Sequence, residues 1–310
     1  MSDIVISEFM DEEVVTRCFS GKDFRYDPGL VDRPGELHSA LADARALIVR
    51  NRTRVDAGLL SAAPRLKVVG RLGVGLDNID LAACKARAIA VHPATGANDD
   101  AVAEYVMAAI FALVRPVFTR GADMRAGRWP RLEMIGGEVA GRRLGLVGFG
   151  AIARKTAARA RALGMKIAAY DPHVDAADPA WRGTERSSLD TLLAQSDIIS
   201  LHVPLTPGTR HLIDADAIAR MKPGSFLINA ARGGVIDERA LADALHAGHL
   251  GGAALDVFET EPLSEDSGAH LASCPNLLLT PHIAGVTAES NIRVSRMIAD
   301  RVLAELAHLP

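Results

Sequence analysis

Three reactive side chains each follow an apolar run in the second half of the chain. Arg232 lies in INAARGGVID, Glu261 in ALDVFETEP and His282 in TPHIAG. An imidazole is suited to take the proton of a hydroxyl group near neutral pH, and a carboxylate beside it would orient the ring and favour its protonated form. A guanidinium presents two parallel donors to a carboxylate and can polarise a carbonyl oxygen. Brought together, these residue types would suit the reversible oxidation of a hydroxy acid.

Taken singly, the same residues have ordinary explanations. Arg232 could be a surface residue after a strand, Glu261 a loop residue before a proline, and His282 a side chain bonded to backbone. Whether they act together therefore depends on the elements that position them.

Short aliphatic runs alternate with helical segments along the chain, and such alternation is typical of a parallel sheet built from βαβ units. Six consecutive runs in the second half fit a doubly wound sheet. We therefore expect an α/β protein of two domains, one over residues 1–98 and a Rossmann-type domain over 99–286. The runs begin near Ile4, Ala46, Lys67 and Ile89 in the first series, and near Leu144, Lys166, Asp197, Ser225, Gly251 and Asn276 in the second.

Two long helical segments complete this division. The segment 99–115 is apolar around most of its circumference, which indicates a buried helix. The segment 287–308 is amphipathic and has no strand of its own, so we expect residues 287–310 to return to the first domain. Its expected apolar face comprises Ile292, Ser295, Met297, Ile298, Val302 and Leu306.

A glycine-rich turn lies between the first strand of the second series and the helix after it. Gly148 permits a tight turn, Gly150 lets the backbone approach a diphosphate, and the helix that begins with Ala151 and Ile152 presents its N-terminus to the phosphates. The next run ends at Asp171, where a carboxylate can accept hydrogen bonds from ribose hydroxyls and would repel a 2′-phosphate. The pattern predicts an NAD site, although two glycines and an Asp before Pro172 are also ordinary turn residues.

The three motifs and the earlier RLGVGLDNID resemble the signatures of the D-isomer-specific 2-hydroxyacid dehydrogenases, over nearly the whole chain. In that family a flavodoxin-like substrate domain accompanies the Rossmann-type domain, and the strand ends face a cleft. The resemblance implies that Arg232, Glu261 and His282 are catalytic, with Arg232 and His282 also next to the cofactor. It further implies that Val74 and Gly75 offer backbone N–H groups to a substrate carboxylate, and that Asn78 is structural.

The resemblance also assigns further cofactor contacts. Asp256 is expected to hold the nicotinamide carboxamide, with the capping of a strand end as the plainer alternative. Val203 and Ala230 are expected to line the cofactor through their backbones.

Arginines in the first half bear on the substrate. Arg50 and Arg71 match positions where phosphoglycerate dehydrogenases carry arginines, and Arg52 and Arg131 are further candidates. Additional guanidinium groups imply a second anionic group on the substrate. We therefore expect a dianionic C3 acid such as 3-phosphoglycerate or sulfolactate, between which the sequence does not choose. The alternative is that these arginines form surface ion pairs with neighbours such as Asp77 and do not bind substrate. In that case a glyoxylate or hydroxypyruvate reductase is the better prediction.

Two other functions share the scaffold. Formate dehydrogenases resemble this family but carry Gln where Glu261 stands, which argues against that activity. Some NAD-sensing corepressors keep the fold and the three residues, so a non-enzymatic binding protein is the second alternative; lack of turnover would identify it.

Composition excludes several other classes. A net charge of −3 and a pI near 6.4 give no basic surface for nucleic acid. The acidic start of the chain and the lack of a long apolar stretch indicate a cytoplasmic protein away from membranes.

Cys18, Cys84 and Cys274 are expected to be buried or half-buried thiols. The pair His246 and His249 lacks an accompanying cluster, so no metal is expected.

Assembly and regulation are the last expectations. The helix from Asp99 and the following segment MRAGRWPRLEMIGGEVAG have too little partner surface within one subunit, which predicts a homodimer. The chain stops at Pro310 without the C-terminal regulatory domains of longer phosphoglycerate dehydrogenases, so feedback inhibition by serine is not expected.

Overall fold

The computed structural model describes residues 2–308 and divides them into two compact units. The first unit comprises the residues up to Asn98 together with those from Val286 onward, and the second comprises Asp99–Gly285. The second boundary lies one residue earlier than the sequence pattern suggested.

The first unit contains a five-stranded parallel sheet in the order β2-β1-β3-β4-β5, which is the flavodoxin-like order. Its central strands are aliphatic and almost wholly buried, as expected for a sheet covered on both faces. The aliphatic pattern missed β2, because this three-residue edge strand is only half-buried and carries aromatic and charged side chains. The strands are β1 (Ile4–Ile6), β2 (Phe24–Tyr26), β3 (Ala46–Val49), β4 (Val68–Arg71) and β5 (Ala90–Pro93).

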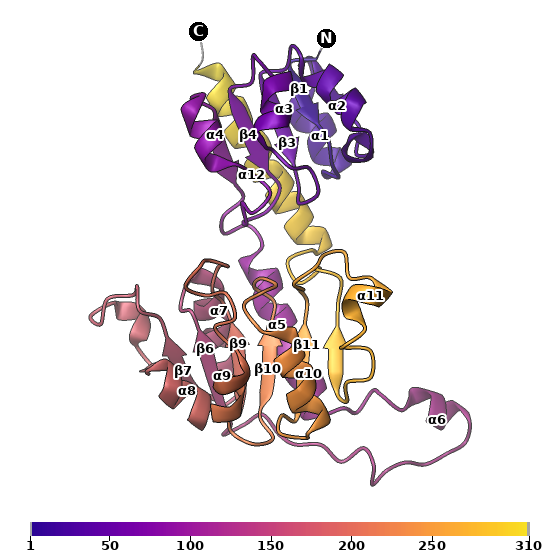
Figure 1. Cartoon of the computed structure of the whole chain (residues 1–310), viewed down its shortest axis with the longest axis vertical. Coiled ribbons are helices and arrows are strands. Elements are labelled where there is room, and N and C mark those ends of the chain that lie inside the picture. Colours follow the sequence, from indigo (N-terminus) through magenta and orange to yellow (C-terminus); the bar gives the residue numbers. More distant parts are fainter. Residues whose placement is uncertain (1, 309–310) are drawn as a thin grey trace. The chain divides into compact units, whose positions relative to one another are not determined.

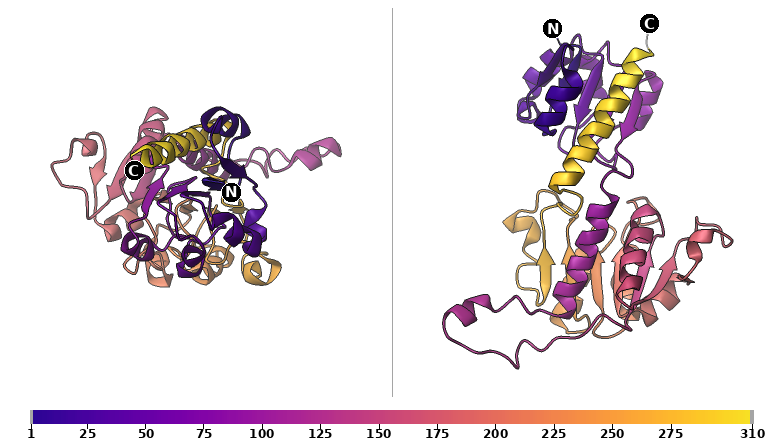
Figure 2. Two further views of the ribbon diagram at one scale, coloured as in Figure 1. Left: turned by 90° about the horizontal axis from the view of Figure 1, so that it is seen from above. Right: turned by 180° about the vertical axis from the view of Figure 1, so that it is seen from behind.

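Helices cover both faces of this sheet. On one face lie α1 (Glu12–Phe19) and α12 (Ala288–Ala307), and on the other α2 (Pro34–Leu41), α3 (Ala57–Ala62) and α4 (Leu81–Ala86), with a 3₁₀ turn at Leu30–Asp32. The C-terminal helix α12, yellow in Figure 2, crosses the sheet.

The contact of α12 with β4 is close. A Cβ at Gly70 would lie 2.5 Å from Ile298 and 2.7 Å from Val302, so glycine allows this approach. One expectation about the helix was wrong: Ile292 is 46% exposed, and Val294 lies in the buried face instead. The sequence pattern could not settle this, because both residues are apolar and only the position of the sheet decides which is covered.

The second unit contains a seven-stranded parallel sheet in the order β12-β11-β10-β9-β6-β7-β8. Numbered within the unit, this is the Rossmann order 3-2-1-4-5-6 with one strand added. The two-residue edge strand β8 was missed because both residues are exposed and charged. The strands are β6 (Arg143–Val147), β7 (Lys166–Tyr170), β8 (Glu185–Arg186), β9 (Ile198–Leu201), β10 (Phe226–Asn229), β11 (Gly252–Leu255) and β12 (Leu277–Leu279).

Two apolar clusters lie on the two faces of this sheet, beneath the helices that cover it (Figure 1). One face is covered by α5 (Asp99–Val114) and α7 (Ala151–Ala162), and the other by α8 (Leu189–Gln195), α9 (Ala215–Arg220) and α10 (Glu238–His246). Helix α5 is buried around most of its circumference, as its composition predicted. A 3₁₀ turn at Pro179–Trp181 and the short α11 (Glu265–Gly268) lie in the connections.

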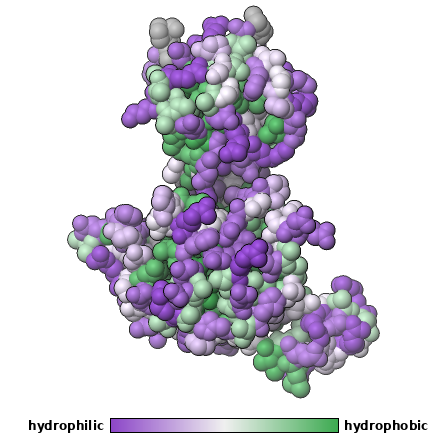
Figure 3. Space-filling model, in the orientation of Figure 1, coloured by the Kyte–Doolittle hydropathy of each residue, from purple (hydrophilic) through white to green (hydrophobic). Residues whose placement is uncertain are grey.

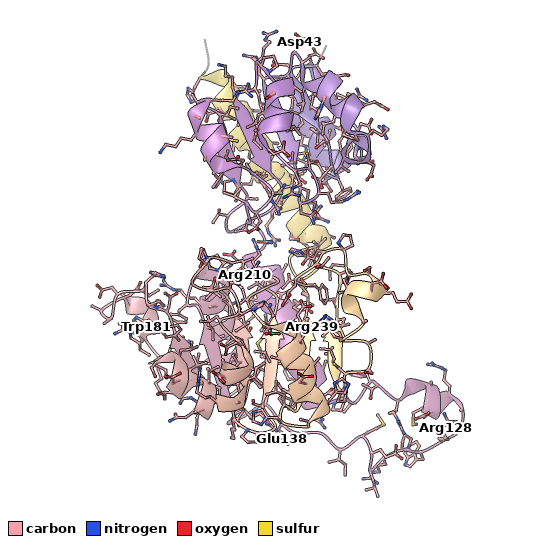
Figure 4. All side chains as sticks on the ribbon, viewed as in Figure 1. Asp43, Arg128, Glu138, Trp181, Arg210 and Arg239 are labelled. Atoms are coloured by element: carbon pink, nitrogen blue, oxygen red, sulfur yellow. The ribbon has the colours of Figure 1, made fainter. Side chains whose placement is uncertain are left out.

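An extended arm, residues 115–142, projects from the second unit between α5 and β6 and contains α6 (Gly121–Arg125) (Figure 1). Figure 4 marks its outer end at Arg128. Large apolar side chains of the arm are exposed, and Figure 3 shows apolar surface at its end. They are Phe118 (94%), Trp129 (76%), Leu132 (82%) and Ile135 (73%).

Within residues 2–308, no helix is both long and apolar enough to cross a membrane.

Candidate active site

The three predicted catalytic residues follow three neighbouring strands. Arg232 follows β10, Glu261 follows β11 and His282 follows β12, and these strands are adjacent in the sheet. Because they are parallel, their carboxyl ends share one edge, so the three loops begin side by side.

His282 and Glu261 form a close pair. Nδ1 of His282 lies 2.7 Å from Oε2 of Glu261. This contact assigns the proton on Nδ1 to the bond with the carboxylate and leaves Nε2 as the nitrogen that can exchange a proton with a substrate. Both side chains are about one third exposed, so a ligand can reach them.

The Glu261 carboxyl is tuned toward its ionised form. Burial by itself would raise its pKa, but hydrogen bonding to His282, the charge of His282, the Phe258 N–H and the charge of Arg232 together lower the pKa below its usual range. The Phe258 N–H donates to Glu261 Oε1 at 3.1 Å. An ionised Glu261 is the state needed to stabilise an imidazolium on His282.

The turn that carries Arg232 is held by the last residue of β10. Asn229, which is buried, accepts a hydrogen bond from the Ala231 N–H at 3.0 Å and donates to the Arg232 carbonyl at 2.8 Å. The next residue, Gly233, lies directly against the loop of Glu261: an added Cβ would be 1.7 Å from the Phe258 carbonyl oxygen. Glycine at this position therefore lets the Arg232 and Glu261 loops meet.

Asp256 is buried against the turn that follows β12. Its carboxylate is 1% exposed, and Oδ1 accepts hydrogen bonds from Thr280 Oγ1 at 2.6 Å and the Ile283 N–H at 2.8 Å, while Oδ2 accepts from the Ala284 N–H at 2.8 Å. The Tyr105 hydroxyl on α5 continues this network to Thr280 at 2.6 Å. In the structure Asp256 thus holds the turn of His282, as the plainer alternative proposed, and a bond to a carboxamide stays a prediction.

The glycine-rich turn has the geometry that a dinucleotide requires. Gly148 has φ +90°, and a Cβ there would lie 2.6 Å from the His202 carbonyl oxygen. Gly150 is the N-cap of α7 and has open space where a Cβ would be, so the helix N-terminus is accessible to a phosphate. These features fit the diphosphate of NAD.

Asp171 supports the turn from the end of β7. Its Oδ2 accepts the Phe149 N–H and its Oδ1 accepts the His173 N–H, both at 2.8 Å. Each oxygen keeps a lone pair that a ribose hydroxyl could use. The remaining predicted cofactor residues, which are Ala151, Ile152, Val203 and Ala230, lie at the start of α7 and after β9 and β10, and are half-buried or exposed.

In the first unit, Arg50 follows β3 at the carboxyl edge of the sheet. Its guanidinium donates to Asn291 Oδ1 at 3.0 Å and lies 5.7 Å from the centre of the Phe9 ring. Burial lowers its pKa, partly offset by the nearby charge of Glu8. Glu8 itself accepts the backbone N–H groups of Arg50, Arg52 and Thr53. Among the described residues, no carboxylate forms a salt bridge with Arg50.

The neighbouring loop after β4 carries the other predicted substrate residues. Arg71 donates to the Leu72 carbonyl at 2.9 Å, and its guanidinium occupies the space that a side chain at Gly73 would fill. In the described chain, the N–H groups of Val74 and Gly75 have no hydrogen-bond acceptor, and their binding of a substrate carboxylate stays a prediction. Asn78 donates to the carbonyls of Arg50 and Thr53, a structural role that ties this loop to Arg50.

Two further arginine candidates lie elsewhere. Arg52 is paired with Asp32 at the surface, which matches the ion-pair alternative. Arg131 lies exposed in the arm.

The other histidines and the cysteines have structural surroundings. His202 is half-buried beside Ser200, and desolvation lowers its pKa to about 4. His246 bonds to the Ala242 carbonyl and Ser273, and His249 to the Ile218 carbonyl. Residues 2–308 hold no group of His, Cys, Asp or Glu that could bind a metal ion. The three cysteines are buried or half-buried, as expected.

Comparison with known proteins agrees with this geometry. The model of the NAD-binding domain of D-isomer-specific 2-hydroxyacid dehydrogenases matches residues 107–284. The chain belongs to this family. It is therefore an NAD-dependent oxidoreductase acting on hydroxy acids.

Individual relatives lie within the same family. The chain is 56% identical over 303 residues to an (S)-sulfolactate dehydrogenase of Chromohalobacter salexigens, and the aligned region covers 97% of each protein. It is 44% identical over 279 residues to a D-3-phosphoglycerate dehydrogenase of Mycobacterium leprae, covering 89% of this chain and 52% of that protein. A solved structure, the TT0316 protein of Thermus thermophilus, has a TM-score of 0.89 at 33% identity and covers 98% of this chain and 96% of its own.

The sequence pattern missed two supports of the dehydrogenase site. Gly233 and Asn229 lie inside the INAARGGVID motif, where the first of the two adjacent glycines was the available signal.

Proposed function

We propose that this dehydrogenase oxidises a D-configured 2-hydroxy acid that carries a second anionic group on C3, with (S)-sulfolactate as the preferred substrate. The observation that carries the proposal is the half-buried guanidinium of Arg50, held by an amide and an aromatic ring instead of a carboxylate. Such a group keeps its charge available for a ligand anion.

The chemistry follows from the residues of the second unit. Nε2 of His282 takes the proton of the C2 hydroxyl, and Glu261 stabilises the imidazolium that results. Arg232 binds the carboxylate of the acid and polarises the C2 oxygen. When bound, NAD accepts the hydride that leaves C2. In the reverse direction His282 returns the proton to the carbonyl oxygen.

The first unit supplies the anion contacts. The N–H groups of Val74 and Gly75 serve the carboxylate, and Arg50 and Arg71 serve the group on C3. A sulfonate is compatible with the D series: its sulfur raises the priority of the C3 substituent above the carboxyl group, so the same spatial arrangement takes the descriptor S. The 56% identity to a sulfolactate dehydrogenase supports the sulfonate over the phosphate.

The test compares kcat/KM for (S)-sulfolactate, D-3-phosphoglycerate, D-lactate and D-glycerate, followed by NADH absorbance. One hydrogen bond to a charged group contributes about 1.5–3 kcal/mol, or about 10- to 150-fold in kcat/KM. We expect sulfolactate to exceed D-lactate by at least this factor. Better turnover of the monoanions would overturn the proposal and favour a glyoxylate or hydroxypyruvate reductase.

Two neighbouring arginines provide a matched pair of variants. Arg50→Ala is expected to remove most of the preference for sulfolactate over D-lactate. Arg52→Ala, which breaks only the surface pair with Asp32, is expected to leave it unchanged. Equal selectivity in wild type and Arg50→Ala would show that the second anion is bound elsewhere.

We also propose that the active unit is a homodimer in which the arm covers apolar surface of a second copy. The support is the exposure of Trp129 and Leu132, since monomers rarely present large apolar side chains together. Sedimentation at micromolar concentration is expected to show a dimer for wild type and a monomer for the double variant Trp129→Ser, Leu132→Ser. Leu81→Ser, at an exposed leucine of the first unit, is the control and keeps the dimer. A monomeric wild type would contradict this proposal.

A further inference from the structure

The segment 257–263, which carries Glu261, has no backbone support of its own. In the described chain none of its N–H or carbonyl groups takes part in a backbone-to-backbone hydrogen bond. Its N–H groups at Phe258 and Glu259 are bound by side chains instead, the first by Glu261 Oε1 at 3.1 Å and the second by Glu238 Oε1 at 2.6 Å. The position of Glu261 therefore depends on carboxylates.

Glu238 and Glu259 bind each other's backbone. Besides the bond from the Glu259 N–H to Glu238, the Glu238 N–H donates to Glu259 Oε1 at 3.3 Å. Glu238 lies in the first turn of α10 and is 5% exposed. The next residue in the sequence, Arg239, is labelled in Figure 4. The first turn of α10 is thus hydrogen-bonded to Glu259, which lies two residues before Glu261 in the loop.

An imidazole lies within hydrogen-bond distance of each of the two carboxylates. His270 Nε2 lies 3.3 Å from Glu238 Oε2, and His211 Nε2 lies 3.2 Å from Glu259 Oε1. Burial and the charge of Glu259 raise the pKa of Glu238, while the Glu259 N–H and His270 oppose this rise. The Glu259 N–H and His270 thus both favour the charged form of Glu238, against its burial.

We propose that Glu238, with His270 as its hydrogen-bond partner, is a positioning residue that holds the Glu261 loop in the geometry in which Glu261 meets His282. It touches neither substrate nor cofactor and acts through the loop alone. A carboxylate is required because one oxygen must accept the short Glu259 bond while the other meets His270. The inference does not depend on which hydroxy acid is the substrate.

The experiment compares Glu238→Ala and Glu238→Gln with wild type, on the acid that wild type oxidises fastest. Misplacement of a reacting group by about 1 Å can cost about 100-fold in rate. We expect kcat to fall between about 10- and 100-fold in Glu238→Ala, with the Kd for NADH unchanged. Glu238→Gln keeps an oxygen acceptor for the Glu259 N–H and is expected to recover part of kcat.

A pH profile separates positioning from mere destabilisation. In the oxidation direction His282 must be neutral, so kcat falls on the acid side. When Glu261 is less well placed, the imidazolium is less stabilised, and the acid limb of kcat moves to lower pH in both variants. Loss of stability alone would lower the amount of folded enzyme without moving this limb. Glu265→Ala, at an exposed acid at the start of α11, is the control and keeps the wild-type profile.

A double-mutant cycle tests the role of His270. If His270 acts through Glu238, His270→Ala and Glu238→Ala lower kcat non-additively, and the double variant resembles Glu238→Ala. The proposal is overturned if kcat and the acid limb in Glu238→Gln match wild type, or if kcat and NADH affinity fall in parallel. If Glu238→Ala does not fold, Glu238→Gln carries the same test.

Discussion

Gly233→Ala is expected to abolish most activity by adding one methyl group between two catalytic loops. The new Cβ would lie 1.7 Å from the carbonyl oxygen of Phe258, 2.2 Å from its carbonyl carbon and 2.9 Å from the Glu259 nitrogen. All three atoms are backbone, so no side chain can rotate away.

The size of the effect follows from this overlap. Non-bonded heavy atoms keep roughly 3.5 Å apart, so the loops of Arg232 and Glu261 must separate by well over 1 Å. A displacement of about 1 Å can lower the rate about 100-fold, whereas overpacking typically costs about 1–3 kcal/mol of stability. We therefore expect a loss of kcat of at least about 100-fold in a protein that still folds.

The assay is steady-state NADH formation, with thermal unfolding and NADH fluorescence as measures of stability and cofactor binding. Gly208→Ala is the matched control, because its Cβ would meet only Thr206 Oγ1 at 3.9 Å, and it is expected to behave as wild type. A kcat for Gly233→Ala within about threefold of wild type would refute the argument that the contact of the two loops sets the catalytic geometry.

Further predictions concern single residues of the site. His282→Gln should lower kcat by orders of magnitude while NADH binding survives, because only the base is lost; near-normal turnover would show that another group is the base. Arg232→Lys should mainly weaken substrate binding, seen as a rise in KM, since an ammonium cannot reproduce the two parallel donors. Asp171→Ala should raise kcat/KM for NADP relative to NAD, because the repulsion of a 2′-phosphate is removed; an unchanged ratio would place the discrimination elsewhere. The pKa of the Glu261 carboxyl is lowered in the folded protein. Its ionised form therefore stabilises the fold fully when the pH is above the ordinary pKa of 4.5, and this contribution is lost as the pH falls through the lowered pKa of the folded protein. The Tm difference between wild type and Glu261→Gln should therefore narrow below pH 4.5, and a constant difference would argue against the lowered pKa.

The sequence by itself determined the fold class and grouped the three candidate catalytic residues. Buried parallel strands read as aliphatic runs, and the loops after neighbouring parallel strands must begin at one edge of the sheet. Arg232, Glu261 and His282 could therefore be grouped from their places after three such runs. The sequence did not predict the edge strands β2 and β8, because short exposed strands carry no apolar pattern.

Only the tertiary structure decided how the trio is held. The bonds of Asp256 to the His282 turn, the contact of Gly233 with Phe258 and the bond between Glu238 and Glu259 all join loops that are far apart in sequence. Local residue types do not specify such contacts, since an aspartate after a strand, a glycine in a turn and a glutamate at a helix start each have many ordinary partners. The choice among those partners is made when the strands pack side by side and bring their loops within reach of one another.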